Sequence, residues 1–220
     1  MSSSVALTEP IKSRRAVYDT EPTIFSAIYQ DDVNLANWQR TLPLNVNEAV
    51  SQLLSKKSDF QCSLTASPET ALESLNETFA SQNYHPLAEN ISELVDMFCY
   101  LFELKQAGIR LAALDKAMCP KFHVDRVPCR LITTYQGIAT EWLPNDLADR
   151  SRLGAGSKGL ADHESGIYCT KSDIQQLNCG DVALLKGEHW FNNEGGGLIH
   201  RSPELLSGES RLLLTLDFAD

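Results

Sequence analysis

The chain has 220 residues, of which 43% are hydrophobic and 22% are charged, values that are ordinary for a globular protein. Its formal net charge is −10 at pH 7 without a lysine or arginine run, which argues against general binding to nucleic acids or anionic membranes. No apolar run approaches the ~20 residues that span a bilayer. Residues 1–10 lack a basic and apolar leader, so we expect a cytoplasmic protein whose six cysteines stay reduced.

In chain order, the first half of the sequence predicts helices. A capping-box pattern at Asn45 opens one helix, and Ser67 before Pro68 is typical of the start of a second. The longest helix is expected over about residues 86–107, where apolar side chains recur every three or four positions. Gly108 is expected to end it.

After Gly108 the apolar period changes from that of a helix to that of a strand. Short strands are predicted, separated by turn-rich segments, over residues 109–113, 122–127, 130–135, 140–143, 166–169, 181–185, 198–201 and 211–218. Many short strands after a helical half indicate an α+β fold with a sandwich or barrel at its core. We expect residues 1–108 to form a mainly helical region packed on a core made by residues 109–220.

Two short segments carry residues suited to metal chemistry. On a strand, His123 and Asp125 would point to the same side, because alternate residues share a face. If residues 198–201 and 211–216 form a symmetric hairpin, His200 lies opposite Arg211 on one face, with Cβ atoms about 5 Å apart. Two histidines and one carboxylate are the ligand set of non-haem Fe(II) sites.

An arginine beside such a metal site indicates that an anion binds there too. An unpaired buried cation is costly, so Arg211 would need an anion. A planar guanidinium binds a carboxylate through two parallel hydrogen bonds, which lysine cannot do. The residues therefore predict a metal site with open coordination positions and a cation that binds a carboxylate.

The order of these residues resembles the Fe(II)/2-oxoglutarate-dependent dioxygenase superfamily, whose fold is a double-stranded β-helix, also called a jelly roll and related to cupins. His123-x-Asp125, the distal His200 and Arg211 eleven residues later carry the resemblance. The segments around residues 130–135, 137–144 and 180–185 also look like strands of that fold. The chain as a whole is similar to a bacterial domain family of unknown function.

The resemblance implies roles for six residues. His123, Asp125 and His200 would hold Fe(II), and Arg211 would bind the distal carboxylate of the cosubstrate 2-oxoglutarate. Tyr135 or Thr133 would hydrogen-bond that carboxylate, since both lie on one face of the predicted strand. The family uses these cofactors to hydroxylate a substrate. The sequence names neither the substrate, which could be a small molecule or a protein, nor the oligomeric state.

Other interpretations remain open. A jelly-roll protein without catalysis could hold zinc or another divalent metal for homeostasis or sensing, and a cupin-like enzyme could use the triad without 2-oxoglutarate. Cys119 and Cys129 could join His123 and Asp125 in a tetrahedral zinc site, although the spacing is unusual. The glycine-rich loop over residues 150–166 is either a mobile lid or a solvated surface loop.

Overall fold

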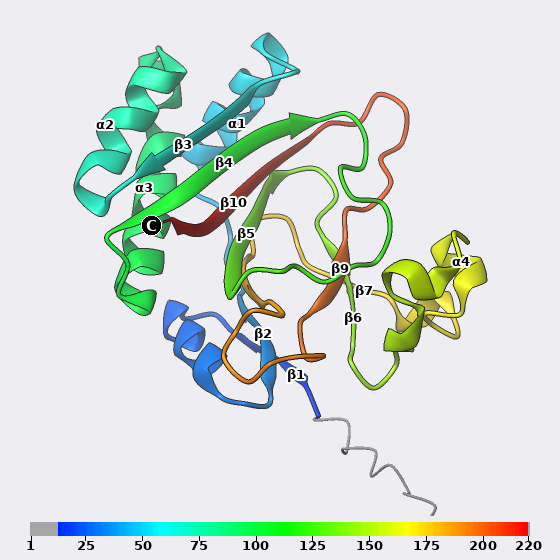
Figure 1. Ribbon diagram of the computed structural model, residues 1–220. Coiled ribbons are helices and arrows are strands. Elements are labelled where there is room, and N and C mark those ends of the chain that lie inside the picture. The colour runs from blue at the N-terminus through cyan, green and yellow to red at the C-terminus, as the bar shows by residue number, and fades with distance from the viewer. Residues whose placement is uncertain (1–12, 220) are drawn as a thin grey trace, which may run out of the picture.

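The structure is a computed structural model that describes residues 13–219, and these residues form two β-sheets with helices on the outer faces (Figure 1). The leader-like pattern sought in residues 1–10 lies outside the described residues. Within residues 13–219 no helix has the length and apolar character required to cross a membrane.

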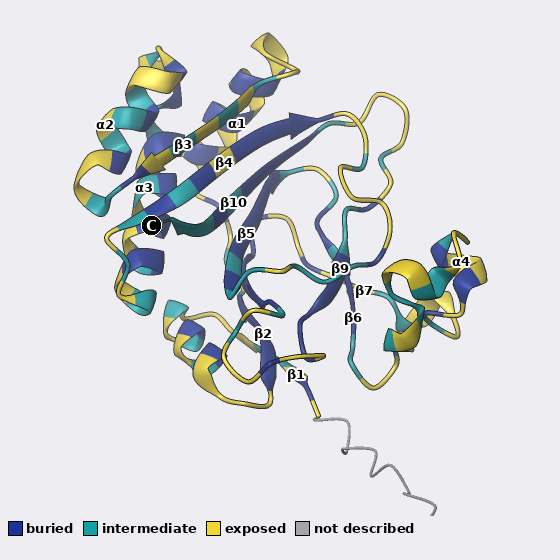
Figure 2. Ribbon diagram, in the orientation of Figure 1, coloured by how far each residue is buried: buried dark blue, intermediate teal, exposed yellow. Residues whose placement is uncertain are grey.

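The larger sheet has seven strands and carries most of the core. Its neighbours run antiparallel except for one parallel pair at the edge, and their order is β1 (Arg15–Asp19), β2 (Val33–Trp38), β8 (Val182–Lys186), β5 (Cys129–Gln136), β10 (Arg211–Ala219), β4 (Gln106–Leu114) and β3 (Gln61–Ala66). Strands β5, β8 and β10 are largely buried, whereas the edge strand β3 alternates between exposed and half-buried residues (Figure 2).

The smaller sheet faces the middle of the larger one. Its strands are, in order, β7 (Gln175–Gln176), β6 (Glu141–Leu143) and β9 (Ile199–Arg201). Apolar side chains from both sheets pack into one cluster, which contains Leu35, Ile132, Ala139, Trp142, Leu177, Ala183, Leu185 and Leu198. Burial of this cluster holds the two sheets face to face.

Three helices cover the opposite face of the large sheet: α1 (Leu44–Lys56), α2 (Pro68–Phe79) and α3 (His85–Phe102). Their apolar residues pack against strand residues such as Leu131, Tyr135 and Leu214. The short helix α4 (Asp162–Ser165) lies beside the small sheet, far from α1–α3 (Figure 1). The remaining described helices are 3-10 helices: η1 (Pro22–Tyr29), η2 (Gln82–Tyr84), η3 (Arg150–Arg152), η4 (Gly154–Ser157) and η5 (Lys171–Asp173).

The three predicted helices are present, but the start of the first and the end of the third differ from the prediction. Pro68 opens α2 behind the N-cap Ser67, as expected, whereas α1 begins after Pro43 without a side-chain cap. The third helix ends at Phe102, because Glu103 adopts a left-handed conformation (φ 54°). Gly108 does not end a helix; it lies within β4, where it pairs with Asp217.

Most predicted strands are present, with ends that differ by a few residues. Two are not: residues 166–169 follow α4 as turns, and residues 122–127 make only one bridge, from His123 to His200. Strands β1, β2, β3 and β7 were not predicted. Residues 13–108 therefore supply three helices and also three strands of the large sheet.

The predicted hairpin between residues 198–201 and 211–216 is wrong. Strand β9 pairs with β6 in the small sheet, whereas β10 lies between β5 and β4 in the large sheet. The connection from Ser202 to Ser210 carries the chain from one sheet to the other. As a result, His200 and Arg211 come from opposite walls of the molecule instead of from neighbouring strands.

Candidate metal centre

The structure brings His123, Asp125 and His200 together. One potential ligand atom from each residue lies within 4.8 Å of the others. Asp125 Oδ1 is 3.7 Å from His123 Nε2, and Asp125 Oδ2 is 3.4 Å from His200 Nε2. Within the described part of the chain, no other cluster of this kind contains three such side chains. The His-x-Asp segment and the distal histidine therefore form one candidate metal centre.

The backbone holds the two histidines in register. His123 and His200 exchange two N–H···O hydrogen bonds of 3.0 Å, so the irregular segment that carries His123 continues the small sheet. Their imidazole centroids are 4.5 Å apart. The end of this segment, at residues 125–127, packs directly against Gly187. A Cβ added to Gly187 would clash with the Val127 carbonyl oxygen. A glycine is required there because the two backbones approach so closely.

Backbone carbonyls determine which nitrogen of each ring is free. His123 Nδ1 lies 2.9 Å from the Lys121 carbonyl and His200 Nδ1 lies 3.1 Å from the Leu198 carbonyl. A carbonyl only accepts, so we assign a proton to each Nδ1 and a lone pair to each Nε2. Burial, and then the neighbouring His200, lower the pKa of His123. Both effects favour the neutral imidazole that a metal ion needs.

Asp125 supplies the negative charge of the site. Burial alone would raise the pKa of Asp125, but the neighbouring side chains of His200, Arg130 and His123 lower it to about 2. Arg130 Nη1 donates to Asp125 Oδ2 at 2.7 Å. The carboxylate is therefore ionised at neutral pH and able to bind a divalent cation.

A second network lies on the outer face of the small sheet, behind the two histidines. Arg201 Nε bonds Glu141 at 2.7 Å, and Arg201 Nη1 bonds Asp162 of α4 at 2.8 Å. The Arg201 guanidinium also lies over the Phe122 ring, 4.2 Å from its centroid. Asp162 accepts a hydrogen bond from the Phe122 backbone N–H at 3.0 Å. The neighbours of both histidines in sequence are thus attached to the same carboxylate.

Arg211 is buried beside the centre. Its side chain is fully enclosed (0% exposed), and burial lowers its pKa to about 10. Arg211 Nη2 donates to Thr140 Oγ1 at 2.7 Å and to Thr134 Oγ1 at 3.0 Å, and Nη1 lies 3.4 Å from Ser202 Oγ. Among residues 13–219, no carboxylate makes an ion pair with Arg211. The guanidinium is solvated by hydroxyl groups alone.

Tyr135 and Thr133, expected to hydrogen-bond the cosubstrate carboxylate, lie on the face of β5 turned away from Arg211. Tyr135 points toward the helices, where its hydroxyl donates to Asn90 of α3 at 2.9 Å. Thr133 shares that face, and its buried hydroxyl has no hydrogen-bond partner. The hydroxyl beside Arg211 belongs to Thr134, one residue away. Both faces of β5 are buried, so alternation in the sequence does not show which one looks toward the site.

The tetrahedral zinc alternative is not supported by the geometry. Cys129 is fully buried in the cluster beneath the helices, on the face of β5 that points away from His123. Burial also raises the pKa of its thiol, which disfavours the thiolate that zinc requires. Cys119 lines the small cavity beside His123 and His200 but is not part of their cluster.

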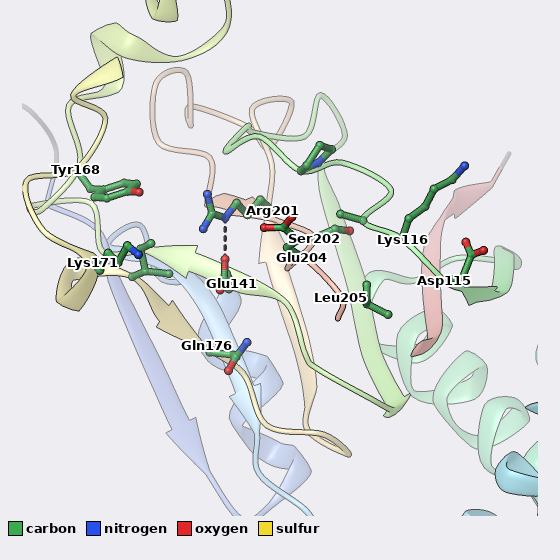
Figure 3. A pocket seen from close by; sticks show the side chains of 13 residues that line it. Asp115, Lys116, Glu141, Tyr168, Lys171, Gln176, Arg201, Ser202, Glu204 and Leu205 are labelled. Atoms are coloured by element: carbon green, nitrogen blue, oxygen red, sulfur yellow. Dashed lines mark hydrogen bonds and ion pairs between the residues drawn. The ribbon is translucent and has the colours of Figure 1, made fainter. Parts of the chain in front are cut away.

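One cavity borders the centre, and a second lies beside the first. The smaller, of about 70 Å³, borders His123, Arg130 and His200 and also contacts Thr140 and Ser202, the hydroxyl partners of Arg211. A larger one, of about 810 Å³, lies on the outer face of the small sheet around Arg201 and Glu141 (Figure 3). Figure 3 shows Tyr168 and Lys171 on one side of it and Lys116 on the other. Arg201 and Ser202 border both cavities.

The loop over residues 150–166 is tied to the body of the protein. Arg150 bonds Glu188 at 2.9 Å and the Gly197 carbonyl at 2.9 Å. Lys121 reaches the Leu160 carbonyl at 3.0 Å. His163 is exposed and distant from the metal cluster, which does not include it. These contacts attach the loop to the segments next to the small sheet, so the loop braces that sheet.

Comparison with known proteins places the chain in a family. Residues 19–217 match the family described as "Protein of unknown function (DUF1826)", and the chain belongs to that family. The match covers the helices and both sheets apart from most of β1 and the last two residues of β10. No curated protein matches the sequence significantly.

Several solved structures are similar to this chain at low sequence identity. A prolyl-4-hydroxylase from Pseudomonas putida is 12% identical, with 89% of this chain and 96% of that chain covered and a TM-score of 0.43. The dioxygenase for auxin oxidation from rice is 10% identical over 84% and 73%, with a TM-score of 0.49. HygX from Streptomyces hygroscopicus, solved with nickel and 2-oxoglutarate bound, is 11% identical over 92% and 86%, with a TM-score of 0.42. At these values the likenesses do not assign an activity.

Proposed function

We propose that this protein is an Fe(II)- and 2-oxoglutarate-dependent oxygenase, a hydroxylase built on a double-stranded β-helix. The observation that carries the proposal is the position of Arg211. Within residues 13–219, a fully buried guanidinium whose hydrogen-bond partners are all hydroxyls lies beside three side chains suited to a divalent metal. A metal centre alone explains the triad, whereas a metal centre with a carboxylate cosubstrate explains both features.

The donor atoms of the triad fit ferrous iron. Two imidazole Nε2 atoms and one carboxylate oxygen are the borderline and hard donors that non-haem Fe(II) binds, and three protein ligands leave positions for other molecules. His123, Asp125 and His200 would hold the ion. Bound iron, together with 2-oxoglutarate and O₂, would supply the oxidising power for hydroxylation.

Arg211 is suited to the distal carboxylate of the cosubstrate. Its guanidinium presents parallel N–H donors, and Thr134 and Thr140 fix the direction of Nη2. Because the surroundings exclude water, an anion bound there would gain more from its charge than at the surface. A protein that only stores or senses zinc has no use for a buried cation in this position.

Succinate formation tests the proposal directly. Purified protein is loaded anaerobically with Fe(II), mixed with 2-oxoglutarate and O₂, and assayed for succinate. We expect slow turnover even without the true substrate, and its loss in His200→Ala. Tight zinc retention, with neither succinate formation nor affinity for 2-oxoglutarate, would instead identify a metal-binding protein without catalysis.

A further inference from the structure

The carboxylate of the candidate centre is held differently from the two histidines. His200 lies in β9, and His123 is joined to it by two backbone hydrogen bonds. Asp125 lies outside the strands, where its carbonyl accepts one hydrogen bond from the Glu188 N–H at 2.9 Å. Its side chain therefore needs a separate support to keep the single orientation that a metal ligand requires.

Arg130 of β5 provides that support. Its Nη1 bonds Asp125 Oδ2 at 2.7 Å, while its Nε and Nη2 bond the two carboxylate oxygens of Asp217 at 2.7 and 3.0 Å. Asp217 belongs to β10, which is adjacent to β5 in the large sheet. The Arg130 guanidinium is thus fixed by two hydrogen bonds to β10, and its third nitrogen, Nη1, donates to Asp125. Lysine, with a single ammonium, cannot reproduce this arrangement.

The charges of the three side chains alternate. Asp217 compensates the cation of Arg130, so the arrangement orients Asp125 without cancelling the negative charge that a metal ion needs. Arg130 occupies Oδ2, and Oδ1 remains on the side of His123 Nε2, at 3.7 Å. All three side chains are at least two-thirds buried, which limits competition from water.

From this geometry we infer that Arg130, held by Asp217, is a positioning residue that presents Asp125 to the metal through one oxygen, Oδ1. The inference rests on the proposed function only in that the triad binds a divalent cation. Removing Arg130 frees the carboxylate to turn and to offer both oxygens. Removing the charge of Asp217 leaves Arg130 one of its two acceptors on β10 and places an uncompensated cation near the metal. The two changes therefore have different consequences.

Co(II) binding to the full chain tests the inference, because Co(II) absorption reports the number and arrangement of ligands independently of catalysis. In Arg130→Met we expect the dissociation constant to rise about tenfold or more and the visible spectrum to change. In Asp217→Asn we expect a similar loss of affinity with a smaller change in the spectrum, because Arg130 keeps its bond to Asp125 but only one of its two acceptors on β10. Arg130→Lys should keep the altered spectrum, because it restores the charge without the paired contact.

Arg110→Met is the matched control. Arg110 is exposed on β4 and lies opposite Thr215 of β10, so its loss removes one positive charge from the same sheet without touching Asp125. The control should bind Co(II) like the parent, and unfolding midpoints of the metal-free variants verify that each is folded. Parental affinity and spectrum in folded Arg130→Met, or an equal loss in Arg110→Met, would overturn the inference. Failure of the parent itself to bind Co(II) would instead overturn the proposed function.

Discussion

Arg201 and Asp162 form a buried ion pair, with Nη1 of the arginine 2.8 Å from Oδ2 of the carboxylate. The pair joins β9, which carries His200, to α4 in the loop over residues 150–166. The same carboxylate oxygen accepts the Phe122 N–H at 3.0 Å, next to His123. One residue of the bracing segment is therefore attached to both histidine-bearing segments of the candidate centre.

Replacing Asp162 should loosen this attachment. Asp162→Ala leaves a largely buried arginine with one remaining acid partner, Glu141, and an unsatisfied backbone N–H, so we expect a loss of about 2–4 kcal/mol of unfolding free energy. Urea unfolding measures the loss. Arg152→Ala, which breaks an exposed pair with Asp149, is the control and should cost less than about 1 kcal/mol. Equal costs would show that the Asp162 contacts do not brace the sheet.

Arg211 should separate cosubstrate binding from metal binding. Arg211→Met removes the guanidinium but none of the three metal ligands, so we expect affinity for 2-oxoglutarate to fall by about 100-fold or more while Co(II) affinity stays within about threefold. Calorimetric titration measures both. Arg211→Lys should not recover the lost affinity, because it lacks the paired donors. Parallel loss of metal and 2-oxoglutarate would contradict this division of roles.

Gly187 should tolerate no side chain. Gly187→Ala places a Cβ 2.0 Å from the Val127 carbonyl and must displace the segment that carries His123 and Asp125. We expect a loss of about 2–3 kcal/mol in stability and weaker Co(II) binding. Gly108→Ala is the comparison, since its nearest new contact is an ordinary 3.7 Å to the Asp217 carbonyl. Parental stability in Gly187→Ala would refute the claim that residue 187 has no room for a Cβ.

The lowered pKa of Lys186 predicts that the stability of the protein rises with pH over a defined interval. Burial, and then the charge of Arg14, lower its pKa from 10.5 to about 8, and its ammonium donates to the Gln30 carbonyl at 2.8 Å. Between about pH 8 and pH 10.5 the unfolded chain binds more protons at this site than the folded chain, so this residue makes stability rise with pH. The gain is about 3 kcal/mol in full.

The comparison of the parent with Lys186→Met isolates this contribution. The difference in unfolding free energy between the two should change in favour of the parent as the pH rises from 8 to 10.5, and it should be constant below pH 7. Denaturant unfolding at closely spaced pH values measures it. A difference that does not vary across this interval would show that Lys186 titrates normally in the folded protein.

Local patterns in the sequence were enough to identify many of the elements. The apolar period changes from that of a helix to that of a strand near Gly108, and β4, β5, β8 and β10 follow within a few residues of where that alternation places them. The residue types of the triad were also readable, because few other side chains bind a transition metal. These features depend on near neighbours along the chain, which the sequence displays directly.

Only the tertiary structure decided which strands pair and which faces meet. β9 and β10 are close in sequence but belong to different sheets, and β5 presents Thr134 rather than Thr133 or Tyr135 to Arg211. Both faces of β5 are buried, so its sequence carries no alternation that distinguishes them. The Arg130–Asp217 contact joins residues 87 positions apart. Such contacts arise from the packing of distant segments, on which local periodicity places no constraint.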